Sequence, residues 1–216
     1  MRRAPNRNLT LYYEHHYRGL ELLDKQPFIL EYLERAYETI IRSTEQYRET
    51  FAFRVDLRFP EGYHPYGLAY QNEHLDRFIE SFKAKIRHNR HISRREHGYA
   101  HDTVVRYIWA SEIGQRGRPH YHIAILLNKD AFCSLGTYAL GRNNLFNRLH
   151  EAWASALGLP LEAVTGLVEL PKNPYYIVHR DDPSSIASFF FRISYLCKAA
   201  TKVYGNGGHG FGASKA

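Results

Sequence analysis

Cysteine and long apolar runs are both scarce in this sequence. The 216 residues contain two cysteines, Cys133 and Cys197, which lie far apart and outside any metal-ligand spacing. This usage argues against a disulfide scaffold and favours a reducing, cytosolic compartment. No stretch approaches the ~18 apolar residues that a membrane span needs. The basic N-terminus also lacks the apolar core of a signal peptide, so we expect a protein that does not interact with membranes.

Acidic residues are outnumbered by basic ones. The chain has 22 Asp and Glu against 29 Lys and Arg, which gives a net charge of +7. A basic surplus on a folded domain favours a polyanionic partner, most commonly nucleic acid, although it also serves simple solubility. The content of 44% hydrophobic and 14% aromatic residues is enough for a packed core. Global disorder is therefore not expected.

Hydrophobic periodicity predicts an α+β fold. Apolar residues at helical spacing predict helices over 28–50, 72–96, 142–158 and 182–204. Alternating patterns predict strands over 51–59, 103–113, 120–128, 163–171 and 175–179. This order favours an antiparallel sheet of about five strands with helices packed on one face, as in ferredoxin-like and RNA-recognition (RRM) folds.

The same patterns predict three regions along the chain. Residues 1–45 form a basic N-terminal arm and helix, residues 46–204 form the main domain, and residues 205–216 form a Gly-rich flexible tail. In the first predicted strand, the odd-numbered positions from Phe51 to Phe59 are apolar. The opposite face carries polar side chains and is expected to be open.

Two histidines lie one residue apart in the predicted strand over 120–128. His120 and His122 therefore share a face, while Tyr121 points toward the core. If the preceding hairpin loop has three residues, Glu112 lies opposite His120, ~5 Å away on the same face. One carboxylate and two imidazoles form a three-point site for a divalent ion, and Mn, Mg, Co, Ni and Zn all suit this donor set. An H-x-H pair alone is a weak motif, because it also occurs on solvated faces.

The last predicted helix carries a second pattern. Arg192, Tyr195, Lys198 and Lys202 recur at three or four residues, so Tyr195 and Lys198 are expected to be neighbours. A phenol has an ordinary pKa of ~10 and is a poor nucleophile at neutral pH. It attacks a phosphodiester only if the phosphate is polarised and the phenolate is stabilised. A metal and a nearby lysine supply these two conditions.

Three motifs in this order resemble those of rolling-circle replication initiators of the HUH endonuclease superfamily. The segment 120–122 matches the His-hydrophobic-His motif, and Glu112 stands eight residues before it, as in initiators of single-stranded DNA viruses. "YLCK", residues 195–198, matches the Y-x-x-K motif that carries one tyrosine. "RVDLRFP", residues 54–60, stands where the first strand motif of the family is found.

Together with the terminal "FG-S", these motifs are most similar to replication proteins of inovirus-like prophages. The resemblance covers roughly residues 45–212. It implies that Glu112, His120 and His122 hold Mg or Mn on the scissile phosphate of single-stranded DNA. It also implies that Tyr195 forms a 5′-phosphotyrosyl link, while Lys198 orients the phosphate or stabilises the tyrosinate.

The resemblance further implies partners and contacts. No GxxxxGK[ST] loop is present, so a host helicase and a host polymerase are expected to act with the protein in the bacterial cytoplasm. No second tyrosine stands at Y-x-x-x-Y spacing, so one tyrosine is expected to act alone. The residues expected to contact DNA at the replication origin are Arg54, Asp56, Arg58, Arg116, Arg118, Arg192 and Lys202.

Two alternatives remain open at the level of sequence. A non-catalytic RRM-like module explains the charge and the strand pattern. It does not explain why Glu112, two histidines and Tyr195 with Lys198 occur together. A single-tyrosine transposase of the HUH superfamily would nick DNA by similar chemistry.

Overall fold

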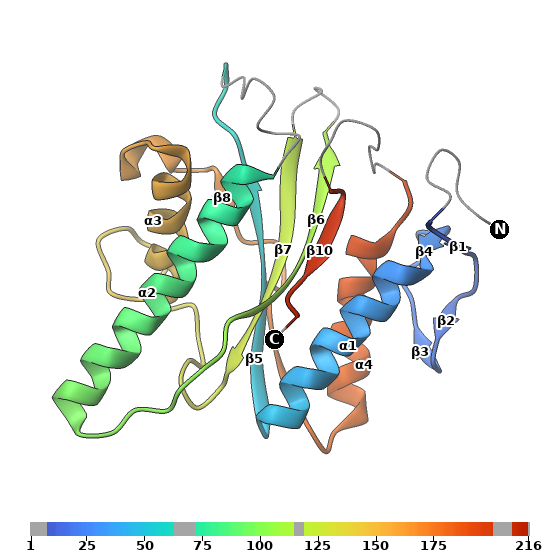
Figure 1. The fold of residues 1–216 in the computed structure, drawn as a ribbon, viewed down its shortest axis with the longest axis horizontal. Helices are drawn as coiled ribbons and strands as arrows, with labels where there is room; N and C mark the ends of the chain where they lie inside the picture. The colour runs from blue at the N-terminus through green and yellow to red at the C-terminus, as the bar shows by residue number, and fades with distance from the viewer. Residues whose placement is uncertain (1–7, 63–71, 115–118, 201–208, 216) are drawn as a thin grey trace.

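A six-stranded antiparallel sheet forms the centre of the fold and lies between two pairs of α-helices (Figure 1). The computed structural model describes residues 8–62, 72–114, 119–200 and 209–215. The strand order is β10–β6–β7–β5–β8, and β9 pairs with the same edge of β5 as β8. The strands are β5 (Glu49–Arg58), β6 (Arg106–Ile113), β7 (Pro119–Asn128), β8 (Val168–Glu169), β9 (Tyr175–His179) and β10 (Phe211–Ala213).

The helices cover both faces of this sheet. They are α1 (Leu30–Gln46), α2 (Glu73–His97), α3 (Leu145–Leu157) and α4 (Pro183–Ser194). Helices α2 and α3 pack on one face and α1 and α4 on the other, as Figure 1 shows. The prediction of helices on one face is therefore wrong, while the α+β class with an antiparallel sheet is confirmed. The second face is apolar along most of its length, where Ala52, Ile108 and Leu126 are fully buried.

The first core lies under α2 and α3. Phe51, Phe53, Val55 and Leu57 of β5 are buried there, as the alternation predicts. Trp153 of α3 is fully buried, and its indole N–H donates to the Arg58 carbonyl at 2.8 Å. Each buried phenylalanine contributes roughly 1.5–3 kcal/mol. This core therefore fixes β5 against the helices.

The second core includes the segment before α1. Four short strands precede that helix, and β1 pairs with β4 while β2 pairs with β3. They are β1 (Leu11–Tyr12), β2 (His16–Tyr17), β3 (Leu20–Glu21) and β4 (Phe28–Ile29). Phe28 is fully buried in the same cluster as Phe190 of α4. The described part of residues 1–45 thus shares a core with the sheet.

Two further predictions need correction. The expected strand over 163–171 is reduced to β8, because Leu161–Val164 form a 3₁₀ turn. The expected flexible tail contains β10, which pairs with β6 at the edge of the sheet. Short glycine-rich segments carry little sequence signal for a strand, because pairing with an existing edge supplies the stability.

Gly212 allows β10 to approach β6 closely. It lies opposite Trp109, and a Cβ at this position would stand 2.5 Å from the indole nitrogen. We expect Gly212→Val to lower the free energy of unfolding by roughly 1–3 kcal/mol, because the indole must move. Urea unfolding measures this loss. The double variant with Trp109→Leu should recover part of it, and an equal loss in both variants would contradict the clash.

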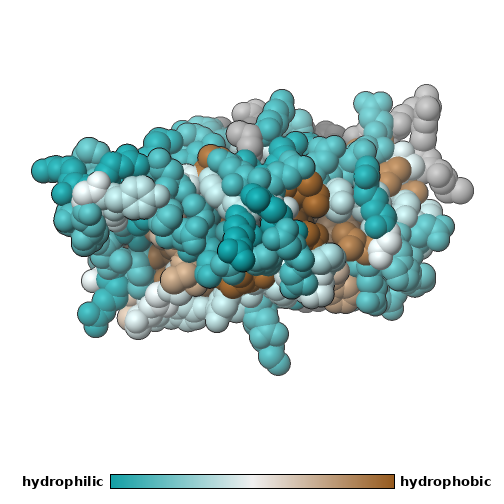
Figure 2. Space-filling view, turned by 90° about the horizontal axis from the view of Figure 1, so that it is seen from below, coloured by the Kyte–Doolittle hydropathy of each residue, from teal (hydrophilic) through white to brown (hydrophobic). Residues whose placement is uncertain are grey.

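The described ranges contain no candidate membrane-spanning helix. None of the four α-helices there is long and apolar enough to cross a bilayer. Seen from below, hydrophilic side chains cover most of the molecule, with small hydrophobic patches between them (Figure 2). This end of the molecule therefore has the character of a solvated surface.

Candidate metal and tyrosine site

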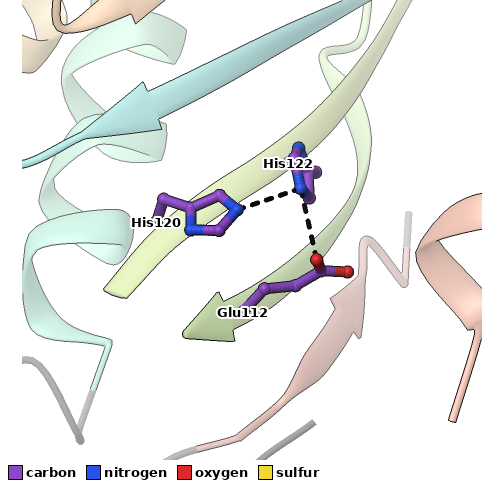
Figure 3. A group of neighbouring side chains, drawn as sticks. All are labelled: Glu112, His120 and His122. Atoms are coloured by element: carbon purple, nitrogen blue, oxygen red, sulfur yellow. Dashed lines mark hydrogen bonds and ion pairs between the residues drawn. The ribbon is translucent and has the colours of Figure 1, made fainter. Parts of the chain in front are cut away.

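Two antiparallel strands bring a glutamate and two histidines together at the upper end of the sheet in Figure 1. Glu112 stands near the end of β6, and it pairs with His120 near the start of β7. This is the register that a three-residue hairpin loop predicts, and the predicted grouping is confirmed. His122 lies two residues further along β7 on the same face, so all three side chains converge (Figure 3).

The three side chains offer converging ligand atoms. His120 Nε2 lies 3.2 Å from His122 Nε2, which lies 3.5 Å from Glu112 Oε2. One ligand atom from each residue lies within 4.8 Å of the others. His122 and Glu112 are only 6% and 4% exposed, so they do not belong to a solvated face. Because two imidazoles and a carboxylate are a common donor set for divalent ions, these residues fit a metal site.

Asp56 fixes the orientation of His122 from behind. Its Oδ1 lies 2.7 Å from His122 Nδ1, and Arg54 donates to the same oxygen at 3.3 Å. Arg54 Nη2 also lies 3.2 Å from Nδ1, but the Asp56 contact is shorter, and a carboxylate only accepts, so Nδ1 donates to Asp56. In the neutral form of His122, Nε2 then carries the lone pair, on the side of the ring that faces His120 and Glu112. This is the tautomer that metal ligation requires.

The two histidines have opposite pKa shifts. Burial lowers the pKa of His122, but hydrogen bonds to Asp56 and Glu112 outweigh it and raise the pKa above its ordinary value. Burial and the neighbouring His122 lower the pKa of His120 despite the opposing charge of Glu112. Burial raises the pKa of Asp56, yet contacts with His122 and Arg54 hold it below its ordinary value. Asp56 is therefore an anion behind the cluster at neutral pH.

Replacing Asp56 tests this orienting role. We expect Asp56→Asn to weaken Mn²⁺ binding about 10–100-fold, because the amide does not hold the required tautomer of His122. Isothermal titration calorimetry measures the affinity. Glu169→Gln is a matched control, since Glu169 lies opposite Asp56 on β8 but pairs with Arg58. An unchanged affinity in Asp56→Asn would show that Asp56 does not orient the ligand.

Tyr195 lies against this cluster on a turn rather than within a helix. Helix α4 ends at Ser194, and Tyr195–Cys197 form a 3₁₀ turn. The predicted helix to residue 204 is wrong, because the chain turns away to pair with the N-terminal segment. Lys198 forms a β-bridge with Phe28, and the next amide donates to the Pro27 carbonyl at 2.8 Å.

The ring of Tyr195 lies close to side chains from β7, from β5 and from the end of its own turn. Its centroid lies 5.4 Å from that of His122, 3.7 Å from Lys198 Nζ and 5.3 Å from Arg54 Cζ. Lys198 also reaches Glu112, with 3.1 Å between Nζ and Oε2. Lys198 is 8% exposed, so this ion pair is buried. The predicted proximity of Tyr195 and Lys198 is therefore confirmed, although a turn brings it about.

The residues predicted to contact nucleic acid are scattered. Arg54 is 4% exposed, so its predicted place on an open strand face is wrong. Arg58 is more exposed and binds Glu169 with 2.7 Å between Nε and Oε2. Arg192 donates to the Lys172 carbonyl at 3.2 Å. Three predicted contacts lie outside the described residues: Arg116, Arg118 and Lys202.

Sequence reasoning missed the contact between Asp56 and His122. The two residues are Cα partners in the β5–β7 register. Pairing the predicted strands over 51–59 and 120–128 side by side would have revealed this neighbour. The alternation alone placed Asp56 on the correct face but suggested no partner for it.

Comparison with known proteins places this chain within a family. The family model described as the YagK/YfjJ C-terminal domain matches residues 14–214. The uncharacterized protein YfjJ of Escherichia coli (strain K12) is 30% identical over 194 residues, which cover 85% of this chain and 93% of YfjJ. The uncharacterized protein YagK of the same organism is 33% identical over 201 residues, covering 87% and 93%. No solved structure matches the chain. From the family match, which spans the sheet, the histidine pair and Tyr195, we conclude that the chain belongs to the YagK/YfjJ C-terminal domain family.

Proposed function

We propose that this protein is a metal-dependent endonuclease that nicks and rejoins single-stranded DNA through Tyr195 and so initiates rolling-circle replication. One observation carries the proposal. The Tyr195 ring lies against His122, and Lys198 bridges from this ring to Glu112. A nucleophile, a cation and a ligand cluster from distant parts of the sequence thus meet at one place.

The fold is consistent with an HUH endonuclease. We propose that the sheet is of that type, with the histidine pair on the central strand β7 between β5 and β6. Glu112, His120 and His122 would hold Mg²⁺ or Mn²⁺. When bound, such an ion would polarise the scissile phosphate.

The covalent step belongs to the tyrosine. The Tyr195 Oη attacks the phosphorus, a new O–P bond forms, and the bond from phosphorus to the 3′ oxygen breaks. The phenol proton leaves to solvent, and the 3′ oxygen takes up a proton to become a free 3′-hydroxyl. Rejoining is the reverse transfer, in which a 3′-hydroxyl attacks the phosphotyrosine and releases Tyr195.

Lys198 and Arg54 supply positive charge beside this step. Lys198 is held by Glu112, and Arg54 is held by Asp56, so neither side chain must reorganise to reach its place near the ring. Fixed cations stabilise charge that develops on a phosphate in a transition state. We assign this role to Lys198 first, because it is the closer of the two to the Tyr195 ring.

The partners follow from the same proposal. The substrate is single-stranded DNA at a replication origin, and the free 3′-hydroxyl primes synthesis by a host polymerase. A host helicase would unwind the duplex in the cytoplasm of a bacterial cell. A single-tyrosine transposase would share the chemistry, and cleavage of transposon ends instead of an origin would identify it.

The alternative of an RRM-like binding module has less support. That mode of binding stacks bases on an open face of the sheet. Here α2 and α3 cover one face, and α1 and α4 cover the other (Figure 1). The described strands therefore leave no broad sheet surface for stacked bases.

A covalent adduct tests the proposal directly. The protein is incubated with Mn²⁺ and a sequence-randomised pool of single-stranded DNA, then separated on a denaturing gel. We expect a band of reduced mobility that nuclease treatment returns to the position of the free protein. The same assay is repeated with DNA hairpins, because an origin can be folded. Tight, metal-independent binding without an adduct on either kind of DNA would favour the binding module.

A further inference from the structure

A solvent-open groove lies far from the tyrosine, at the other end of β6. Its volume is about 520 Å³, and it lies between α2, the segment leading into β6 and the C-terminal residues after β10. This size falls within the range of ligand-binding pockets. Its lining includes Lys83, Ile86, Arg87, Val105, Tyr107 and Lys215.

The groove is strongly basic. Three of its lining residues are basic and none is acidic. It borders the second half of α2, where residues 81–97 contain six Lys and Arg against one Glu. Lys83 pairs with Glu80 at 2.9 Å, but the glutamate side chain is 65% exposed. Such a surface pair is weak, so the lysine remains able to bind an anion.

An aromatic ring and an apolar floor accompany this charge. Lys83 Nζ lies 5.4 Å from the centroid of the Tyr107 ring, and Ile86 is buried beside it. Ser214 holds the C-terminal residues in place, because its N–H donates to the Tyr107 carbonyl at 2.9 Å and its hydroxyl accepts from the Tyr107 N–H at 3.2 Å. Lys215 follows directly at the rim of the groove.

We propose that this groove is a second binding site for single-stranded DNA, separate from the tyrosine site. A nucleotide joins an anionic phosphate to a flat apolar base, and the groove offers cations next to the half-buried ring of Tyr107. Basic grooves with aromatic platforms bind single strands without sequence readout. That the bound nucleic acid is DNA rests on the proposed function. That the groove binds a nucleic acid strand rests only on its charge and its aromatic ring.

The position of the groove suggests what it does. Tyr107 and Glu112 are five residues apart on one extended strand, which is ~17 Å. Tyr107 packs on the core under α2, whereas Glu112 faces the tyrosine on the other side of the sheet. A DNA strand that occupies both sites would have to pass from one face of the sheet to the other. The groove would therefore hold DNA flanking the nick without contacting the reacting phosphate.

Charge reversal tests the groove. Binding of a fluorescent single-stranded oligonucleotide is followed by anisotropy, with Tyr195→Phe in every protein so that no covalent link forms. We expect Arg87→Glu to weaken binding about tenfold and to reduce the salt slope by about 1. Arg142→Glu, an exposed arginine outside the groove, should change affinity less than about twofold. Equal losses of affinity in both variants would show that only the net charge of the protein matters, and would overturn the proposal.

Photo-crosslinking gives an independent readout. An oligonucleotide containing iodouridine is expected to crosslink to the peptide that contains Tyr107, and Tyr107→Leu should remove that crosslink. Wild-type affinity in Arg87→Glu together with no crosslink at Tyr107 would overturn the proposal even if a covalent adduct forms at Tyr195. If Arg87→Glu weakens DNA binding but no adduct forms at Tyr195, the binding groove is supported and the proposed nicking function fails. Stronger competition by polyglutamate than by DNA of equal charge would point to an acidic protein partner instead.

Discussion

Tyr195→Phe is expected to abolish the covalent adduct, a loss of roughly 10³-fold or more, because the substitution removes the attacking oxygen. The phenylalanine ring retains the contacts with His122 and Lys198 that hold the side chain. Metal affinity and the affinity for single-stranded DNA should therefore stay within about twofold of wild type. Densitometry of denaturing gels and anisotropy measure the two quantities side by side.

Tyr176→Phe is the matched control for this variant. Tyr176 is a partly buried tyrosine that packs on Phe189 of α4, and it has no described contact with the ligand cluster. Its adduct yield should equal that of the wild type. If Tyr195→Phe still forms the adduct, the nucleophile lies elsewhere in the chain, and peptide mapping of the linked DNA would locate it.

His122→Ala is expected to have the second largest effect. His122 is the centre of the cluster, since it contacts Asp56 on one side and Glu112 and His120 on the other. Its loss removes a ligand and leaves two carboxylates without their shared partner. We expect Mn²⁺ affinity to fall by more than about 100-fold, beyond the effect of losing an orienting group alone. Metal-stimulated adduct formation should fall with it.

Calorimetry with Mn²⁺ and a metal titration of adduct yield measure these losses. His150→Ala provides a control of similar burial, because His150 lies on α3 and binds the Phe146 carbonyl instead of the cluster. His122→Gln preserves most of the side-chain volume and separates ligand loss from a packing defect. Metal stimulation that survives both His122 substitutions would exclude this residue as a ligand.

Local pattern predicted the elements that carry the site. The alternation in β5 identifies the face that lies under α2 and α3, and hairpin geometry places Glu112 opposite His120 from the sequence alone. Both rest on interactions between near neighbours in the chain, and the period of two along a strand determines the face of every side chain. The site residues nearest to the hairpin were therefore predictable.

The remaining features depend on contacts between distant segments. No local sequence feature of α4 ends the helix at Ser194. The chain leaves the helical path there because Lys198, four residues later, forms a β-bridge with Phe28. The contact between Asp56 and His122 likewise depends on β5 and β7 lying side by side. The two residues are far apart in the sequence, so no local pattern specifies this pairing. The second helical layer was missed because the polar residues of β5 suggested a solvated face.

The β-bridge between Lys198 and Phe28 makes the two ends of the domain inseparable. A shortened chain that starts at residue 46 would retain the ligands, the tyrosine and the lysine, but it would lack the backbone that fixes the tyrosine turn. We expect such a truncation to lose activity through geometry alone. In evolutionary terms, substitutions in the N-terminal segment and in the tyrosine turn are therefore expected to covary among related proteins.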